Sequence, residues 1–217
     1  MGPPENALLA DEFFLIAHDD QYGRPRLHGV AIRFGLAAAL LGELAIARHI
    51  NFAQGNVYVY DSRPPTDWLQ HRALSQIIAE PQQRATRTWL TYLAATSYEN
   101  VGQRLVETGV VEIQERRRFF GLAASTPLYV PRDMNRAAWS WARLSQRLRN
   151  SEQLDSFDLI LAGIAEATGL DRFILDGAPY ATGAFLRSLL AAAPESMHDL
   201  LADLRTSIGA ASLNPRA

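Results

Sequence analysis

Four arginines and one tryptophan recur at helical spacing between residues 132 and 147. At 100° per residue they fall within a sector of about 80° on one side of a helix. Guanidinium groups pair well with phosphate oxygens, and an indole ring suits the headgroup zone of a bilayer. The pattern predicts a basic-aromatic face that binds anionic phospholipid, and the alternative is a solvated face that keeps the protein soluble. The residues of this face are Arg132, Arg136, Trp139, Arg143 and Arg147. We expect the opposite face, which carries Trp141 and Leu144, to pack on the core.

A second basic cluster, Arg116, Arg117 and Arg118, directly precedes Phe119 and Phe120. Three consecutive arginines beside two aromatic rings could contact lipid phosphate or the phosphate backbone of a nucleic acid. The alternative is that the two phenylalanines are strand residues with at least one ring in the core. Residues 116–149 carry eight arginines and a single carboxylate, Asp133, so positive charge concentrates in this part of the chain.

Residues with the spacing of a catalytic or metal site are missing from the sequence. The five histidines form no i, i+4 pair with an acidic partner, and the chain has no cysteine. It also lacks a GxSxG motif and a glycine-rich loop that could cradle phosphate. We therefore expect a protein that is not an enzyme and that holds no metal or cofactor.

A nucleic-acid-binding protein is one alternative reading of the same residues. A helix at 97–108 followed by a basic hairpin has the outline of a winged helix. That helix carries Glu99 and Glu107 with Arg104 alone to oppose them, and acidic residues repel the DNA backbone. Nucleic acid is therefore an unlikely partner. A further alternative is a protein-binding scaffold whose arginines dock an acidic partner.

These side chains are positioned by elements that are mostly helical. Residues 29–49 are apolar on almost every side, which predicts a buried central helix whose glycines let neighbouring helices approach closely. Other helices are predicted near 8–17, 66–79, 82–95, 97–108, 133–150, 154–168, 178–193 and 195–208. Two hairpins are expected, one pairing 50–53 with 57–60 and one pairing 110–114 with 119–123 around a tip at 115–118. The predicted fold is a mainly α helical bundle with two small β-hairpins.

Bulk composition is typical of a globular protein. The chain has 217 residues, of which 48% are apolar and 20% charged, and a formal net charge of −2. We expect a single domain over 1–217 with its core at about 7–208. No signal peptide is evident after Met1. The longest apolar run, 34–42, is shorter than the roughly 20 residues of a membrane span, so membrane contact should be peripheral.

Several segments resemble the Golgi phosphoprotein 3 family. They are the stretch from Leu8 to Ile50, NVGQRLVETGVVEI at 100–113, ERRRFFGL at 115–122 and YVPRD at 129–133, so the resemblance spans most of residues 7–205. Eukaryotic members are peripheral membrane adaptors that bind phosphatidylinositol 4-phosphate. The resemblance implies a non-enzymatic adaptor, and a hairpin near the Arg116–Arg118 cluster is associated in the family with self-assembly and membrane contact. The compact N-terminus resembles that of a bacterial-type homologue.

The family's headgroup site consists of one tryptophan and three arginines, and none of them is retained in this chain. Alignment on Gly35-Leu36 puts His28 at the tryptophan position and Ala37 at the first arginine position; alignment on Asn100-Val101 puts Glu99 and Gly102 at the other two. A glutamate repels phosphate, and three charge-assisted contacts are lost. Arg33 and Arg104 lie close in sequence and could substitute, or they could form structural ion pairs.

These observations lead to one expectation about function. The chain should be a cytoplasmic, peripherally membrane-associated adaptor that contacts anionic phospholipid through its arginines. Selective binding of phosphatidylinositol 4-phosphate is not predicted, because the matching residues are replaced. A homo-oligomer and an unidentified protein partner are both compatible with the sequence.

Overall fold

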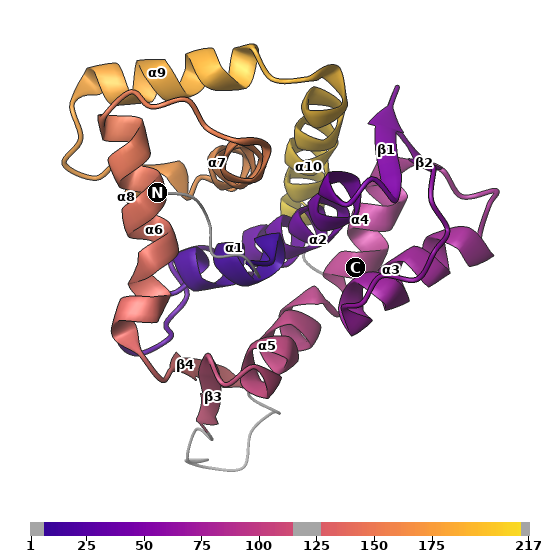
Figure 1. The fold of residues 1–217 in the computed structure, drawn as a ribbon, viewed down its shortest axis with the longest axis horizontal. Helices are drawn as coiled ribbons and strands as arrows, with labels where there is room; N and C mark the ends of the chain where they lie inside the picture. Colours follow the sequence, from indigo (N-terminus) through magenta and orange to yellow (C-terminus); the bar gives the residue numbers. More distant parts are fainter. Residues whose placement is uncertain (1–6, 115–126, 214–217) are drawn as a thin grey trace.

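The computed structural model describes residues 7–114 and 127–213, and it is mainly helical as the sequence predicts (Figure 1). The helices in chain order are α1 (Leu9–Ala17), α2 (Gly29–Ile46), α3 (Trp68–Ala79), α4 (Thr86–Ala94), α5 (Ser97–Glu107), α6 (Met134–Arg149), α7 (Ser156–Thr168), α8 (Asp171–Ile174), α9 (Tyr180–Ala191) and α10 (Glu195–Leu213). The strands are β1 (Ile50–Ala53), β2 (Asn56–Val59), β3 (Val111–Gln114) and β4 (Leu128–Pro131), which form two antiparallel pairs.

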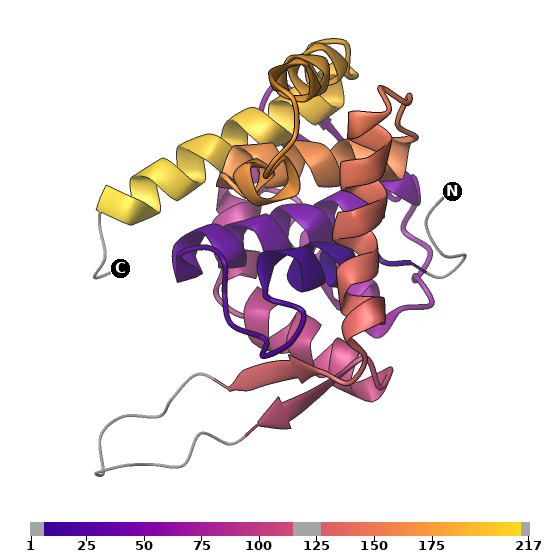
Figure 2. The same ribbon diagram turned by 90° about the vertical axis from the view of Figure 1, so that its left-hand side faces the viewer.

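Helix α2 lies at the centre of the molecule, and α1, α3, α4, α5, α7 and α10 all pack against it (Figures 1 and 2). Its length and mean hydropathy of 1.7 would suit a membrane span, but 67% of it is buried inside the protein. Arg33 and Glu43 lie within it, and Glu43 is buried. The environment of α2 is therefore that of a core helix, as its apolar residues on all sides predict.

Two glycines let α1 approach α2 closely. A Cβ atom added at Gly35 would lie 2.3 Å from the ring of Phe13, and one at Gly42 would lie 2.7 Å from a methyl group of Leu9. Such distances leave no space for a side chain, so these glycines are required by packing rather than by backbone conformation. Every residue of α1 is buried, including the adjacent carboxylates Asp11 and Glu12.

The second hairpin differs from the predicted one. Val111 pairs with Pro131 and Gln114 pairs with Leu128, so the strand that returns is 128–131 and not 119–123. The connection between the paired strands therefore spans residues 115–127. Residues 119–123 lie outside the described part of the chain. Both segments contain leucine and aromatic residues, which suit a strand, and local propensity could not distinguish them.

Candidate functional site

A pocket of about 280 Å³ opens where the α1–α2 loop, the first turns of α2 and α5, and strand β4 meet. Its apolar walls come from Pro25, Ile32, Pro127 and Leu128, and the ring of Tyr98 contributes one side. The remaining lining residues are Gly29, Arg33 and Glu99. This volume is just below the range of about 300–1,000 Å³ usual for small-molecule sites. We call it the α2 pocket.

Two opposite charges lie on the wall of the α2 pocket. The side chains of Arg33 and Glu99 are both exposed, and within the described residues neither forms a hydrogen bond or an ion pair, with the other or with a third group. Ser97 fixes their spacing, because its buried hydroxyl donates a 2.9 Å hydrogen bond to the backbone carbonyl of Arg33. The first turn of α5 is thereby tied to the second turn of α2.

The loop between α1 and α2 borders the pocket and is held rigidly. The Asp19 carboxylate accepts backbone hydrogen bonds from Tyr22 and Arg24, both at 2.6 Å, and although burial acts in the opposite direction these bonds lower the pKa of Asp19. Gly23 has φ +64°, and an added Cβ would meet the carbonyl oxygen of Tyr129 at 1.9 Å. The loop is thus pressed against β4, and it leaves Tyr22 53% exposed beside the guanidinium of Arg24.

Each position that matches the family headgroup site has a specific structural place. His28 is exposed and caps α2, because its ring nitrogen accepts the N–H of Val30. Ala37 is completely buried. Gly102 lies under Tyr129, and a Cβ added there would be 2.3 Å from the tyrosine ring. Glu99 is the member of this set that lines the α2 pocket.

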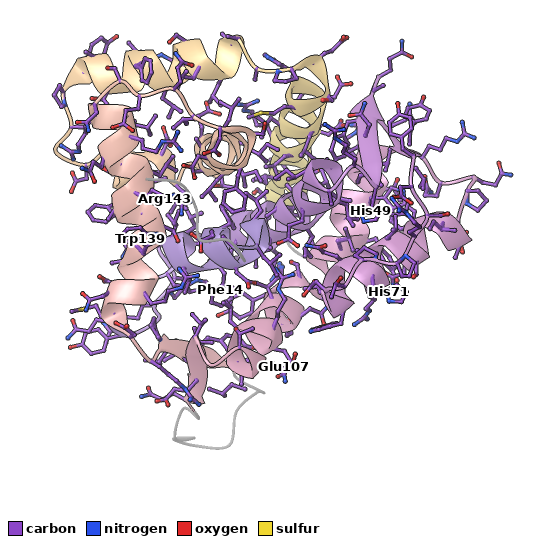
Figure 3. The ribbon with its side chains drawn as sticks, in the orientation of Figure 1. Phe14, His49, His71, Glu107, Trp139 and Arg143 are labelled. Carbon is purple, nitrogen blue, oxygen red and sulfur yellow. The ribbon has the colours of Figure 1, made fainter. Side chains whose placement is uncertain are left out.

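The predicted basic-aromatic face of α6 is not formed as a surface. Arg143 is only 4% exposed, and its guanidinium lies 3.5 Å from Glu12 on α1 and donates a 2.7 Å hydrogen bond to Asp158 on α7 (Figure 3). Arg136 donates to Glu12 at 2.9 Å, and Arg147 pairs with Asp155 at 2.8 Å and with Asp158. These arginines neutralise the buried carboxylates of Glu12 and Asp158. A buried carboxylate needs such a partner, because an unpaired charge in the protein interior is strongly destabilising.

The rest of that face is divided between surface and interior. Arg132 is exposed, with Glu112 3.9 Å away, and Trp139 is half-buried. Trp141, which we expected in the core, is 37% exposed and donates its indole N–H to the carbonyl of Phe173. The angular pattern placed Ala137, Leu144 and Leu148 correctly in the core. It was wrong for Trp141 and Arg143, because charge pairing with α1 and α7 extends the buried side of α6 to the arginine. Arg116, Arg117 and Arg118 lie outside the described residues.

Arg104, considered as a substitute phosphate ligand, is a structural residue. It is 2% exposed and donates hydrogen bonds to Asp11 at 2.8 Å, Glu43 at 3.0 Å and Asp67 at 2.9 Å. Burial raises the pKa of Asp11 to about 7, although the positive charge of Arg104 acts to lower it. The negative charges of Glu43 and Asp67 raise the pKa of Asp11 further. Its burial also leaves α5 with acidic exposed side chains, Glu99 and Glu107, which does not suit a DNA-reading helix.

The sequence did not indicate the pocket residues Pro25, Tyr98, Pro127 and Leu128, or the neighbouring Tyr22 and Arg24. They come from three separate segments and share no spacing. The unusual loop sequence QYGRPR could have drawn attention to the α1–α2 connection, because it places an aromatic and two arginines around a glycine. In the described ranges, 7–114 and 127–213, no group of three or more potential ligands is placed to hold a metal ion.

Comparison with known protein families identifies a match over most of the chain. A family model described as Golgi phosphoprotein 3 (GPP34) matches residues 9–206 of the 217. No curated protein matches the chain significantly.

Proposed function

Because the chain belongs to the Golgi phosphoprotein 3 family over residues 9–206, we propose that it is a non-enzymatic peripheral membrane adaptor that contacts anionic phospholipid. The proposal places the protein in the cytoplasm, on the surface of a membrane. It moves the contact from α6, where the arginines are paired with buried carboxylates, to the edge of the molecule around the α2 pocket.

One observation carries this placement. Arg33 is exposed on the wall of the α2 pocket, Arg24 is exposed beside Tyr22 in the loop that borders it, and neither guanidinium has a carboxylate partner within the described residues. Exposed, unpaired arginines near a membrane each contribute about 1 kcal/mol of attraction to anionic lipid. A tyrosine prefers the interface, where its ring is in contact with lipid and its hydroxyl with water. We call this group the loop edge.

Selective recognition of phosphatidylinositol 4-phosphate is not part of the proposal. An arginine at position 37 would place its charge in the core, since Ala37 has no exposed surface. One at position 102 would collide with Tyr129. Attraction by the loop edge should therefore depend on net vesicle charge and on salt rather than on one headgroup.

Liposome co-sedimentation tests the proposal. Vesicles of phosphatidylcholine would be compared with vesicles containing phosphatidylglycerol or phosphatidylinositol 4-phosphate at matched surface charge, at low and high salt. We expect binding to both anionic vesicles alike, weakened by salt. The variant Arg24→Glu/Arg33→Glu should bind at least about tenfold more weakly. The control Arg187→Glu, a single charge reversal on α9 at the opposite end of the molecule (Figure 1), should bind like the unmodified protein.

Three results would overturn parts of this proposal. Equal binding to neutral and anionic vesicles would remove the electrostatic contact. Equal loss in both charge-reversal variants would mean that net charge matters and the loop edge does not. A marked preference for phosphatidylinositol 4-phosphate would show a selective site built from other residues.

A further inference from the structure

The α2 pocket combines features that belong to a different ligand from a phosphoinositide. It offers one cation, Arg33 on α2, and one anion, Glu99 on the neighbouring helix α5, and these two charges do not form an ion pair with each other. A pocket for a purely anionic group would not carry an unpaired carboxylate on its wall, because like charges repel. A ligand that satisfies both side chains must carry a negative and a positive group a short distance apart.

We propose that the α2 pocket binds a phosphoethanolamine group, with its phosphate at Arg33 and its primary ammonium at Glu99. This inference rests on the proposed function, since phosphatidylethanolamine is the membrane source of that group. It names a headgroup for the pocket, in addition to the general attraction of the loop edge for anionic lipid.

The phosphate end of the pocket is favourable for a negative charge in two ways. Arg33 presents a guanidinium, whose planar fork matches phosphate oxygens. Gly29, in the first turn of α2, also lines the pocket, and the positive end of the helix dipole lies there. The Arg33 guanidinium lies beside Gly29, since an added Cβ at that glycine would be 3.9 Å from its Nη1 atom. Helix end and arginine therefore act at one place.

The ammonium end is favourable for a primary amine in particular. Glu99 can accept hydrogen bonds from a primary ammonium, whereas the methyl groups of a choline would prevent such bonds. Recognition of choline usually relies on a cage of several aromatic rings, and Tyr98 is the single aromatic ring among the described lining residues. The apolar walls formed by Ile32, Pro127 and Leu128 suit the glycerol and the start of the acyl chains.

The first test uses soluble headgroups and the full chain, so that it does not depend on membrane attachment. Glycerophosphoethanolamine, glycerophosphocholine and glycerol phosphate would be titrated while the amide resonances of Gly29 and Glu99 are followed by NMR. We expect glycerophosphoethanolamine to bind most tightly. Glu99→Gln should weaken it about tenfold, the effect of one charge-assisted hydrogen bond, and should bring it level with glycerophosphocholine. Arg33→Gln should weaken all three ligands.

Control variants separate these effects from changes in folding. Glu195→Gln and Arg187→Gln alter exposed residues on α10 and α9 and should leave all three affinities unchanged. Glu99 also lies in the first turn of α5, where an acidic residue favours the helix. Loss of that role would lower the stability of the protein, but it would not change the ratio of its affinities for glycerophosphoethanolamine and glycerophosphocholine. That ratio decides the test.

The second test uses vesicles that contain phosphatidylglycerol at constant content, with and without phosphatidylethanolamine in place of phosphatidylcholine. We expect tighter binding with phosphatidylethanolamine, and no such gain for Glu99→Gln. Soluble binding without any vesicle binding would retain the pocket and reject the membrane function. Vesicle binding that ignores phosphatidylethanolamine, together with equal affinity for the soluble ethanolamine and choline compounds, would reject the pocket and retain the membrane function.

Discussion

Arg143 illustrates at the scale of one residue why arginines on a helix do not by themselves predict a binding surface. Its guanidinium lies between Glu12 and Asp158, both of which are completely buried. A carboxylate in such a place needs a cation, because the protein interior solvates charge poorly. In the amino-acid sequence Arg143 is indistinguishable from Arg132, which is exposed.

Replacing Arg143 by alanine should therefore cost about 3–5 kcal/mol of unfolding free energy, the usual cost of leaving one member of a buried pair uncompensated. Arg132→Ala, the control just before the start of the same helix, should cost less than about 0.5 kcal/mol. Chemical denaturation followed by circular dichroism measures both. Equal, small losses would mean that Arg143 is a surface residue after all.

Asp11 gives a prediction about pH, because three carboxylates surround Arg104. Burial raises the pKa of Asp11 from 3.8 to about 7, so the folded protein holds a proton that the unfolded chain releases above pH 4. The stabilisation is complete below the unfolded pKa and is lost as pH rises from about 4 to 7. Asp11→Asn cannot titrate, and it should remove this part of the pH dependence, about 1–4 kcal/mol in size.

The measurement is unfolding free energy against pH for the unmodified protein, Asp11→Asn and the exposed control Asp176→Asn. The difference between the first two curves is what matters, because burial also lowers the pKa of His18 to about 4 and that residue contributes a slope of opposite sign. A difference curve that is flat between pH 4 and 7 would contradict the assignment of the proton to Asp11.

At the scale of elements, the close contact of α5 with β4 leaves no space for a side chain at Gly102, one of the positions that match the family's headgroup site. Tyr129 fills the space above Gly102, and its ring also packs edge-on against Phe14 and Tyr98. Gly102→Ala should cost about 1–3 kcal/mol, because the added methyl group displaces the ring.

In a protein that also carries Tyr129→Leu, the change Gly102→Ala should lower the unfolding free energy clearly less. Denaturation of the two single variants and the double variant gives the coupling energy between positions 102 and 129. Strict additivity would show that the ring and the glycine do not compete for space.

The sequence was sufficient for the elements whose burial is apolar. The apolar residues Leu36, Leu40 and Leu44 predicted the buried central helix, and all three are buried in it. Gly35 and Gly42 correctly indicated close contacts between helices. The sequence was insufficient where a strand or a pocket is completed by residues from distant segments. The strand at 128–131 pairs with 111–114 across a connection whose length no local pattern determines, and the α2 pocket is assembled from three such segments.

At the scale of the whole molecule, α1 connects two charge networks that lie on different sides of it. Asp11 faces Arg104 with Glu43 and Asp67, and Glu12 faces Arg136 and Arg143 with Asp158 beyond. Helices α3 and α5 depend on the first network and α6 and α7 on the second. The amides of α3 and α5 should therefore lose their protection from hydrogen exchange separately from those of α6 and α7.

Hydrogen exchange measured by mass spectrometry tests this separation. Glu12→Gln should increase exchange mainly in α6 and α7, and Asp11→Ala should increase it mainly around α3 and α5. Increases spread evenly over all helices in both variants would mean that the molecule opens as a single cooperative unit.

The two neighbouring carboxylates of α1 also restrict how the gene can change. Successive helical residues point 100° apart, so a single inserted or deleted codon within α1 would turn the following carboxylate away from its arginines and misdirect the ring of Phe13 from Gly35. One frame-preserving event would damage both networks and the glycine contact together. Length variation should therefore accumulate in the connections and be excluded from this nine-residue helix.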